Sequence, residues 1–179
     1  MLFPGSSGRY AQRLALALLL GTWSSLAQAA ATEGEIKAAY LYKLASFVRW
    51  PEGVDSSSKF TICVASRSDV ARLLEKLADG QQVGGRAVMV EQLTSAQAAR
   101  VKECQLLFVG RGNADALFKA AHGLPVLTVG DRNSGARGGV VDFLFRDGRV
   151  RLVIDRGAAD TQHLELSSKL LDVAVTVTP

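Results

Sequence analysis

Few side chains in this sequence are of the types that perform covalent or metal chemistry. The 179 residues include two cysteines, Cys63 and Cys104, and two histidines, His122 and His163. Neither histidine lies near a nucleophile motif such as Gly-x-Ser-x-Gly, and the sequence has no His-Glu-x-x-His or paired-carboxylate pattern. Neither histidine has a metal-ligand spacing to a cysteine. The sequence therefore predicts a protein that is not an enzyme and that carries no metal and no cofactor.

The N-terminal segment predicts export from the cytoplasm. Arg9 and Arg13 form a basic start, an apolar run follows over 14–20, and residues 27–29 have the small-x-small pattern of a cleavage site. The apolar run is too short to span a bilayer. We therefore interpret the segment as a secretory signal peptide, with a membrane anchor as the alternative.

Export decides how the cysteines are interpreted. Cleavage is expected after Ala29, which gives a signal peptide over 1–29 and a domain over 30–179. No apolar stretch of that domain approaches the ~20 residues of a membrane span, so we expect a periplasmic domain without direct membrane insertion. An oxidising compartment favours a disulfide between Cys63 and Cys104, and two buried free thiols are the alternative.

A glycine-rich polar loop over 130–139 is a candidate ligand site. It follows a predicted strand, and ligands of open α/β sheets bind in the crevice beyond the strand ends. Asp131, Arg132, Asn133 and Arg137 could recognise a small charged ligand there. An ordinary solvated connection, with glycines at turn positions, explains the same composition equally well.

Aromatic residues are concentrated in one predicted helix. Tyr40, Phe47 and Trp50 can share one face of it, in a chain with only 7% aromatic residues. Core packing is the usual explanation for such a group. The alternative is an aromatic patch that binds a partner protein, because tyrosine and tryptophan are enriched at interface hot spots.

The charge balance argues against a nucleic-acid partner. The formal net charge is +4 over the whole chain, and loss of Arg9 and Arg13 with the signal peptide leaves +2. A nearly neutral domain with interspersed charges lacks the basic surface that binds DNA or RNA.

The pattern of apolar segments predicts the fold. Short apolar runs alternate with helical runs, which indicates a single α/β domain whose largely parallel sheet is flanked by helices. Asp147-Gly148 between two apolar runs predicts a C-terminal β-hairpin, and a terminal helix is expected after it. The expected strands are 60–65, 87–91, 104–109, 125–129, 140–145 and 150–154, and the expected helices are 36 to about 50, 69–77, 95–102, 113–121 and 166–173.

Seven segments, in the correct order, resemble the YfiR family of periplasmic repressors. The resemblance covers Gly34 to Val175 and includes the Trp50-Pro51 element at the end of the first helix. Asp155 stands where the family usually has asparagine, and a second cysteine pair found in some members has no counterpart. The resembling segments are 36–51, 60–64, 103–109, 128–131, 138–143, 149–155 and 166–171.

The resemblance implies a function. It indicates a non-enzymatic repressor that binds the periplasmic domain of an inner-membrane diguanylate cyclase, so that its release raises cyclic di-GMP and favours biofilm formation. It also implies redox sensing through a disulfide, for which Cys63 and Cys104 are the candidates. A homodimer remains compatible with the sequence. The alternative function is that of a periplasmic small-ligand binding protein that uses the loop over 130–139.

Overall fold

The structure, a computed structural model, describes residues 30–54, 58–110 and 114–179. The fold described below is that of the compact unit over 31–179. The expected signal peptide over 1–29 lies outside the described residues.

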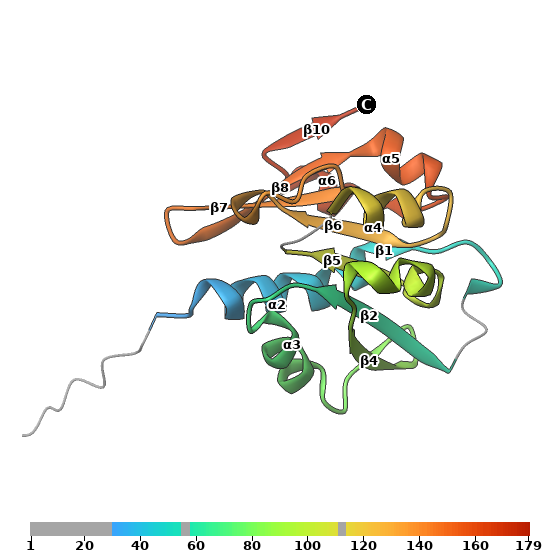
Figure 1. Cartoon of the computed structure of the whole chain (residues 1–179). Coiled ribbons are helices and arrows are strands. Elements are labelled where there is room, and N and C mark those ends of the chain that lie inside the picture. The colour runs from blue at the N-terminus through green and yellow to red at the C-terminus, as the bar shows by residue number, and fades with distance from the viewer. Residues whose placement is uncertain (1–29, 55–57, 111–113) are drawn as a thin grey trace, which may run out of the picture. The chain divides into compact units, whose positions relative to one another are not determined.

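Helices and strands alternate along most of the second unit (Figure 1). The α-helices are α2 (Glu33–Leu44), α3 (Val70–Ala78), α4 (Ala114–Ala121), α5 (Arg156–Thr161) and α6 (Ser168–Asp172), and the 3-10 helices are η1 (Ala45–Phe47), η3 (Ser95–Glu103) and η4 (Arg132–Ser134). The strands are β1 (Val48–Arg49), β2 (Lys59–Ala65), β3 (Gln82–Val83), β4 (Arg86–Gln92), β5 (Leu106–Val109), β6 (Leu127–Asp131), β7 (Val141–Arg146), β8 (Arg149–Asp155), β9 (Glu165–Leu166) and β10 (Thr176–Thr178).

Eight of these strands form one mixed sheet in the order β10-β8-β7-β6-β5-β2-β4-β3. The five central strands, β7, β6, β5, β2 and β4, are parallel to one another. At the two sides of this group, β8 pairs antiparallel with β7 and β3 pairs antiparallel with β4, and β10 is parallel to β8. β1 and β9 form a separate antiparallel pair. The single α/β domain with a largely parallel sheet is thus confirmed.

The two faces of the sheet carry separate cores because side chains alternate along each strand. Phe60 and Ile62 of β2 belong to the cluster that includes residues of α2, α3 and α6. Cys63 and Ala65 of the same strand belong to the other cluster, which is covered by η3 and α4. The strands are buried on both sides, and this explains why their sequences are continuous apolar runs.

The predicted C-terminal hairpin is formed by β7 and β8. Asp147 and Gly148 at its tip both have positive φ, at 53° and 70°. A two-residue turn of this kind matches the right-handed twist of the strands and favours Asp-Gly.

Two predicted helix boundaries were wrong for the same reason. The first helix was expected to reach about Trp50, but α2 ends at Leu44 and a 3-10 helix continues only to Phe47, because Val48 and Arg49 are extended and pair with Leu166 and Glu165. This pairing also shortens the terminal helix, which begins at Ser168 instead of Leu166. A strand pair joined across more than a hundred residues leaves no local pattern that could predict it.

Candidate functional site

An apolar groove lies between α2 and α6, and we call it the α2–α6 groove. Its volume is about 370 Å³. α2 and η1 supply one wall, while β8 and α6 supply the other. Its hydrophobic lining includes Ile36, Tyr40, Phe47, Leu152, Leu170 and Val173.

Two of the predicted aromatic residues, Tyr40 and Phe47, line this groove, and both are half-buried. The Tyr40 ring meets Phe143 of the core edge to face, with centroids 6.0 Å apart and planes at 73°. Val173 is 65% exposed. Aromatic and aliphatic groups that are partly open to solvent at one place are typical of a protein-binding surface.

Trp50, the third predicted aromatic residue, does not lie in the groove. It is only 7% exposed, and its ring meets Phe60 of β2 with centroids 5.1 Å apart. The expectation that Tyr40, Phe47 and Trp50 share one helical face was wrong, because α2 ends at Leu44. Trp50 instead packs in the core and borders a separate cleft that also contains Phe47.

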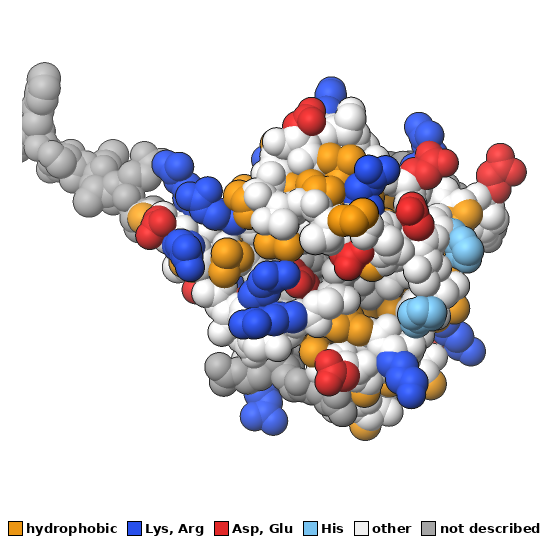
Figure 2. Space-filling view, turned by 90° about the horizontal axis from the view of Figure 1, so that it is seen from above, with side chains coloured by type: hydrophobic (Ala, Val, Ile, Leu, Met, Phe, Trp, Pro, Cys, Tyr) orange, Lys and Arg blue, Asp and Glu red, His pale blue; other side chains and the backbone are white. Residues whose placement is uncertain are grey.

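The surface around the C-terminal elements is otherwise mixed in character. Figure 2 shows small hydrophobic groups separated by basic and acidic side chains on one face. Val173, Val175 and Val177 are among the exposed large hydrophobic residues, at 65%, 49% and 40%.

The first turn of α2 is fixed by a capping box. The Thr32 hydroxyl accepts a hydrogen bond from the Glu35 backbone N–H, and the Glu35 carboxylate accepts one from the Thr32 backbone N–H at 2.7 Å. The Thr32 backbone N–H and the Thr32 hydroxyl, which lies 3.0 Å from Glu35 Oε2, both donate to this carboxylate and lower the pKa of Glu35 below its ordinary value. The carboxylate that borders the groove is therefore engaged in starting the helix.

A buried ion pair fixes α2 to the sheet. Lys37 Nζ lies 2.6 Å from Asp131 Oδ2, and the side chains of both residues are 5% exposed. Lys37 also pairs with Glu33 one helical turn earlier. The sequence did not indicate the Lys37–Asp131 pair, because its partners are 94 residues apart and a Glu-Lys spacing of four residues is typical of a solvated helix surface.

Asp131, a predicted ligand contact, thus points into the protein. Besides Lys37, it accepts hydrogen bonds from the backbone N–H of Asn133 at 3.1 Å and from the Ser134 hydroxyl at 2.9 Å. Its carboxylate holds the turn that follows β6 in shape.

Arg132 of the same loop is also bonded within the protein. Arg132 Nε donates to Asp142 Oδ2 at 3.1 Å, and Asp142 also accepts from the backbone N–H groups of Gly138 and Gly139. Gly139 allows a close backbone approach, because a Cβ there would lie 2.8 Å from the Thr128 carbonyl oxygen. Arg137 is exposed. The described contacts account for most of the polar residues that favoured a ligand site.

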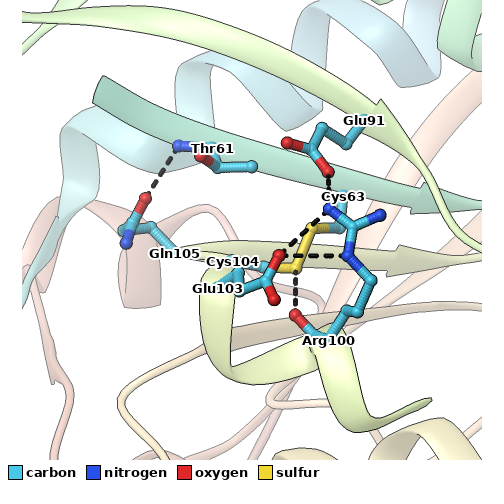
Figure 3. The surroundings of a disulfide bond; sticks show 7 residues. All are labelled: Thr61, Cys63, Glu91, Arg100, Glu103, Cys104 and Gln105. Carbon is cyan, nitrogen blue, oxygen red and sulfur yellow. Dashed lines mark hydrogen bonds and ion pairs between the residues drawn. A yellow bond between two sulfur atoms is a disulfide. The ribbon is translucent and has the colours of Figure 1, made fainter. Parts of the chain in front are cut away.

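The two cysteines are joined by a disulfide that links β2 to the residue ending η3, with Cα atoms 5.8 Å apart (Figure 3). Cys63 and Cys104 are 1% and 2% exposed. Beside the disulfide, Arg100 pairs with Glu103 and Glu91, and these hydrogen bonds raise the pKa of the Arg100 guanidinium. The predicted pairing is therefore present, and its sulfur atoms lie within the core.

Two further features concern only the described residues. Within 30–54, 58–110 and 114–179, no three His, Cys, Asp or Glu side chains are grouped so that they could hold a metal ion. Over these same ranges, every helix is too short or too polar to cross a bilayer.

A family model described as YfiR/HmsC-like matches residues 34–175. A solved structure, a conserved domain protein from Vibrio cholerae O1 biovar El Tor, is similar with a TM-score of 0.50 and 12% sequence identity, over 79% of this chain and 60% of that one. This chain thus spans less than two thirds of that protein, and the likeness concerns the fold alone. The comparison with curated proteins found no match.

Proposed function

The chain belongs to the YfiR/HmsC-like family, and from this premise we propose that it represses an inner-membrane diguanylate cyclase by binding its periplasmic domain. The observation that carries the proposal is the family match over 34–175, which spans both walls of the α2–α6 groove. Family membership supports a periplasmic regulator of diguanylate cyclase in general. The chain acts by binding and not by catalysis, and loss of binding raises cyclic di-GMP and favours biofilm formation.

The binding surface is the α2–α6 groove. Its hydrophobic side chains come from three segments that are distant in the sequence and are held together by the core. Binding a partner's apolar side chains there would remove this surface from water, at roughly 25 cal/mol per Å² of apolar area. Tyr40 and Phe47 supply the aromatic contacts that dominate many interfaces.

Repression requires a difference in affinity between two states of the partner. A bound protein shifts an equilibrium only as far as it prefers one state over the other. The repressor therefore binds the inactive form of the cyclase more tightly than the active form.

Delivery to the periplasm depends on residues 1–29 acting as a signal peptide that is removed after Ala29. The released domain over 30–179 then reaches the cyclase from the periplasmic side without inserting into the membrane. If Edman sequencing of the periplasmic protein gives an N-terminal sequence that begins at Ala30, this step is supported. Full-length protein in the cytosol with its leader intact would contradict it.

The disulfide makes repression sensitive to reduction. Reducing the Cys63–Cys104 bond loosens the core beneath β2 and β5 and lowers the population that is competent to bind. A Cys63→Ser variant should bind the cyclase domain more weakly in a pull-down and raise cellular cyclic di-GMP. Unchanged binding by this variant would contradict redox control.

A charge placed in the groove tests the binding surface. We expect Phe47→Glu to weaken binding of the cyclase's purified periplasmic domain at least tenfold in calorimetry, because a carboxylate would have to be desolvated in an apolar contact. Met89→Glu is the matched control, since Met89 is 42% exposed on β4, away from the groove-lining segments. Wild-type affinity in Phe47→Glu, with the fold verified by circular dichroism, would exclude the groove as the docking surface.

A further inference from the structure

One edge of the main sheet is only partly covered by a neighbouring strand. β3 pairs with residues 86 and 87 of β4, and just beyond this pair the Val88 N–H donates to the Gln81 carbonyl oxygen. Over the ranges that the structure describes, no strand pairs with this side of β4 from residue 89 to residue 92. Figure 1 shows β4 at the rim of the sheet, near α3. The sheet therefore has an open edge here.

The backbone of Val90 faces this open edge. The N–H groups of Ala87 and Leu93 donate toward β2, to the carbonyl oxygens of Ser58 and Val64. Backbone groups alternate in direction along a strand, and Val90 is three positions from both Ala87 and Leu93, so its N–H and C=O point away from β2. Unpaired groups of this kind are a template for a strand of another chain.

A hollow runs along the same edge, and we call it the β4-edge groove. Its volume is about 500 Å³. The end of α3 and the turn after it line one side, and residues 87–90 of β4 line the other. Met89 is 42% exposed there, whereas Val88 and Val90 pack against the core. An exposed methionine adapts its shape to different apolar side chains, so it suits a binding surface.

The charge of the β4-edge groove is negative. Glu75 and Asp79 are the only charged residues among its described lining, and both are exposed. Neither forms an ion pair with a residue in the part of the chain that the structure covers. They lie in the last turn of α3 and at its C-cap, where the helix dipole is also negative. The groove therefore favours a cationic partner.

We propose that the β4-edge groove binds an extended, basic segment of another protein, which adds a strand beside β4. The segment exchanges backbone hydrogen bonds with Val90, places an apolar side chain against Met89, and directs a lysine or arginine toward Glu75 and Asp79. In such strand addition, the backbone gives affinity and the side chains give specificity. The groove shares no lining residue with the α2–α6 groove, so the proposal does not depend on the binding of a cyclase.

A synthetic peptide tests the proposal directly. Fluorescein-labelled KVTVTVK-amide, which is basic and has a high preference for the extended conformation, should bind the wild-type protein with saturation in fluorescence anisotropy. The acidic peptide EVTVTVE-amide should bind at least tenfold more weakly, because like charges would meet in the groove. The basic peptide with every valine and threonine N-methylated should also bind at least tenfold more weakly, because it lacks those backbone donors. No saturable binding of the basic peptide, or equal binding of either control peptide, would overturn the proposal.

Variants locate the binding on this edge. Glu75→Gln/Asp79→Asn should weaken binding of the basic peptide at least fivefold, whereas Asp172→Asn, at an exposed acid outside the groove, should change it less than twofold. Val90→Pro removes an N–H that faces outward, and proline is tolerated at such positions of edge strands. With its fold verified by circular dichroism, Val90→Pro should bind at least tenfold more weakly. Wild-type affinity in folded Val90→Pro, or in the Glu75→Gln/Asp79→Asn protein, would overturn the proposal.

Discussion

The loop over 130–139 and the α2–α6 groove differ in how their side chains are used. In the loop, Asp131, Arg132 and Asn133 form hydrogen bonds within the protein. In the groove, Tyr40 and Phe47 remain partly open to solvent beside other apolar groups. A segment rich in polar residues is therefore not automatically a binding site, because its polar groups can be consumed in forming a turn.

This difference determines what a substitution should change. Removing a bonded group from the loop leaves a buried partner unsatisfied and lowers the stability of the fold. Removing a half-exposed group from the groove should cost less stability, and its main effect is expected on the proposed binding.

Replacing Asp131 should have the largest effect. Asp131→Ala leaves the Lys37 ammonium buried without its main partner, and breaking a buried ion pair on one side typically costs about 3 to 5 kcal/mol. Urea unfolding followed by circular dichroism would measure the loss. The double variant Lys37→Met/Asp131→Leu is the control, and we expect it to recover most of the stability. A loss below about 1 kcal/mol in Asp131→Ala would show that this loop carboxylate is not structural.

Removing the disulfide should have the next largest effect. The bond closes a long loop, with a sequence separation of 41 residues, and its loss in Cys63→Ala/Cys104→Ala should cost about 2 to 4 kcal/mol. Urea unfolding of the wild-type protein, with and without a thiol reductant, gives the comparison. The reduced wild type should unfold at nearly the same urea concentration as the double variant. Equal stability of the oxidised and reduced forms would show that the bond does not hold this side of the core.

The sequence predicted those parts of the fold that depend on local patterns. The apolar runs gave the central strands, and Asp147-Gly148 gave the hairpin. α5 was not expected, because it has only six residues, includes Gly157 and has no extended apolar periodicity. β10 was not expected either, since all three of its residues are exposed and show no alternation of burial.

The candidate site was predicted less completely than the fold. Tyr40 and Phe47 were identified as aromatic residues near one another, but their groove also needs Leu152 and Leu170, which the fold brings from far along the chain. The pair between Lys37 and Asp131 likewise joins distant segments. A single sequence shows which residues are apolar or charged, but it does not show which of them remain open after the chain folds.

Substitution of Asn133 also tests the loop, with a smaller expected loss of stability. Its side-chain amide donates to the Phe145 carbonyl oxygen at 3.0 Å and accepts from the Phe145 backbone N–H at 2.7 Å. Because this contact is exposed, Asn133→Ala should cost only about 1 to 2 kcal/mol in urea unfolding, the sum of two ordinary hydrogen bonds. Asn133→Asp keeps the acceptor and loses the donor, so its stability should lie between those of Asn133→Ala and the wild type. If Asn133→Ala is as stable as the wild type, this side chain is not needed to shape the loop.

Substitution of Glu35 should have the smallest effect on stability, and this effect should depend on pH. Glu35 borders the groove, but its carboxylate is already engaged in capping α2. Its pKa is lowered in the folded protein, chiefly by the hydrogen bonds from Thr32, so its contribution is present above the unfolded-state pKa and is lost as the pH falls through the folded-state pKa. Glu35→Gln retains a side-chain oxygen that can cap the helix but has no ionisable group. Thermal unfolding from about pH 6 down to about pH 3 should therefore show the wild type losing stability relative to Glu35→Gln. A difference between the two proteins that stays constant over this range would mean that the ionised carboxylate is not part of the cap.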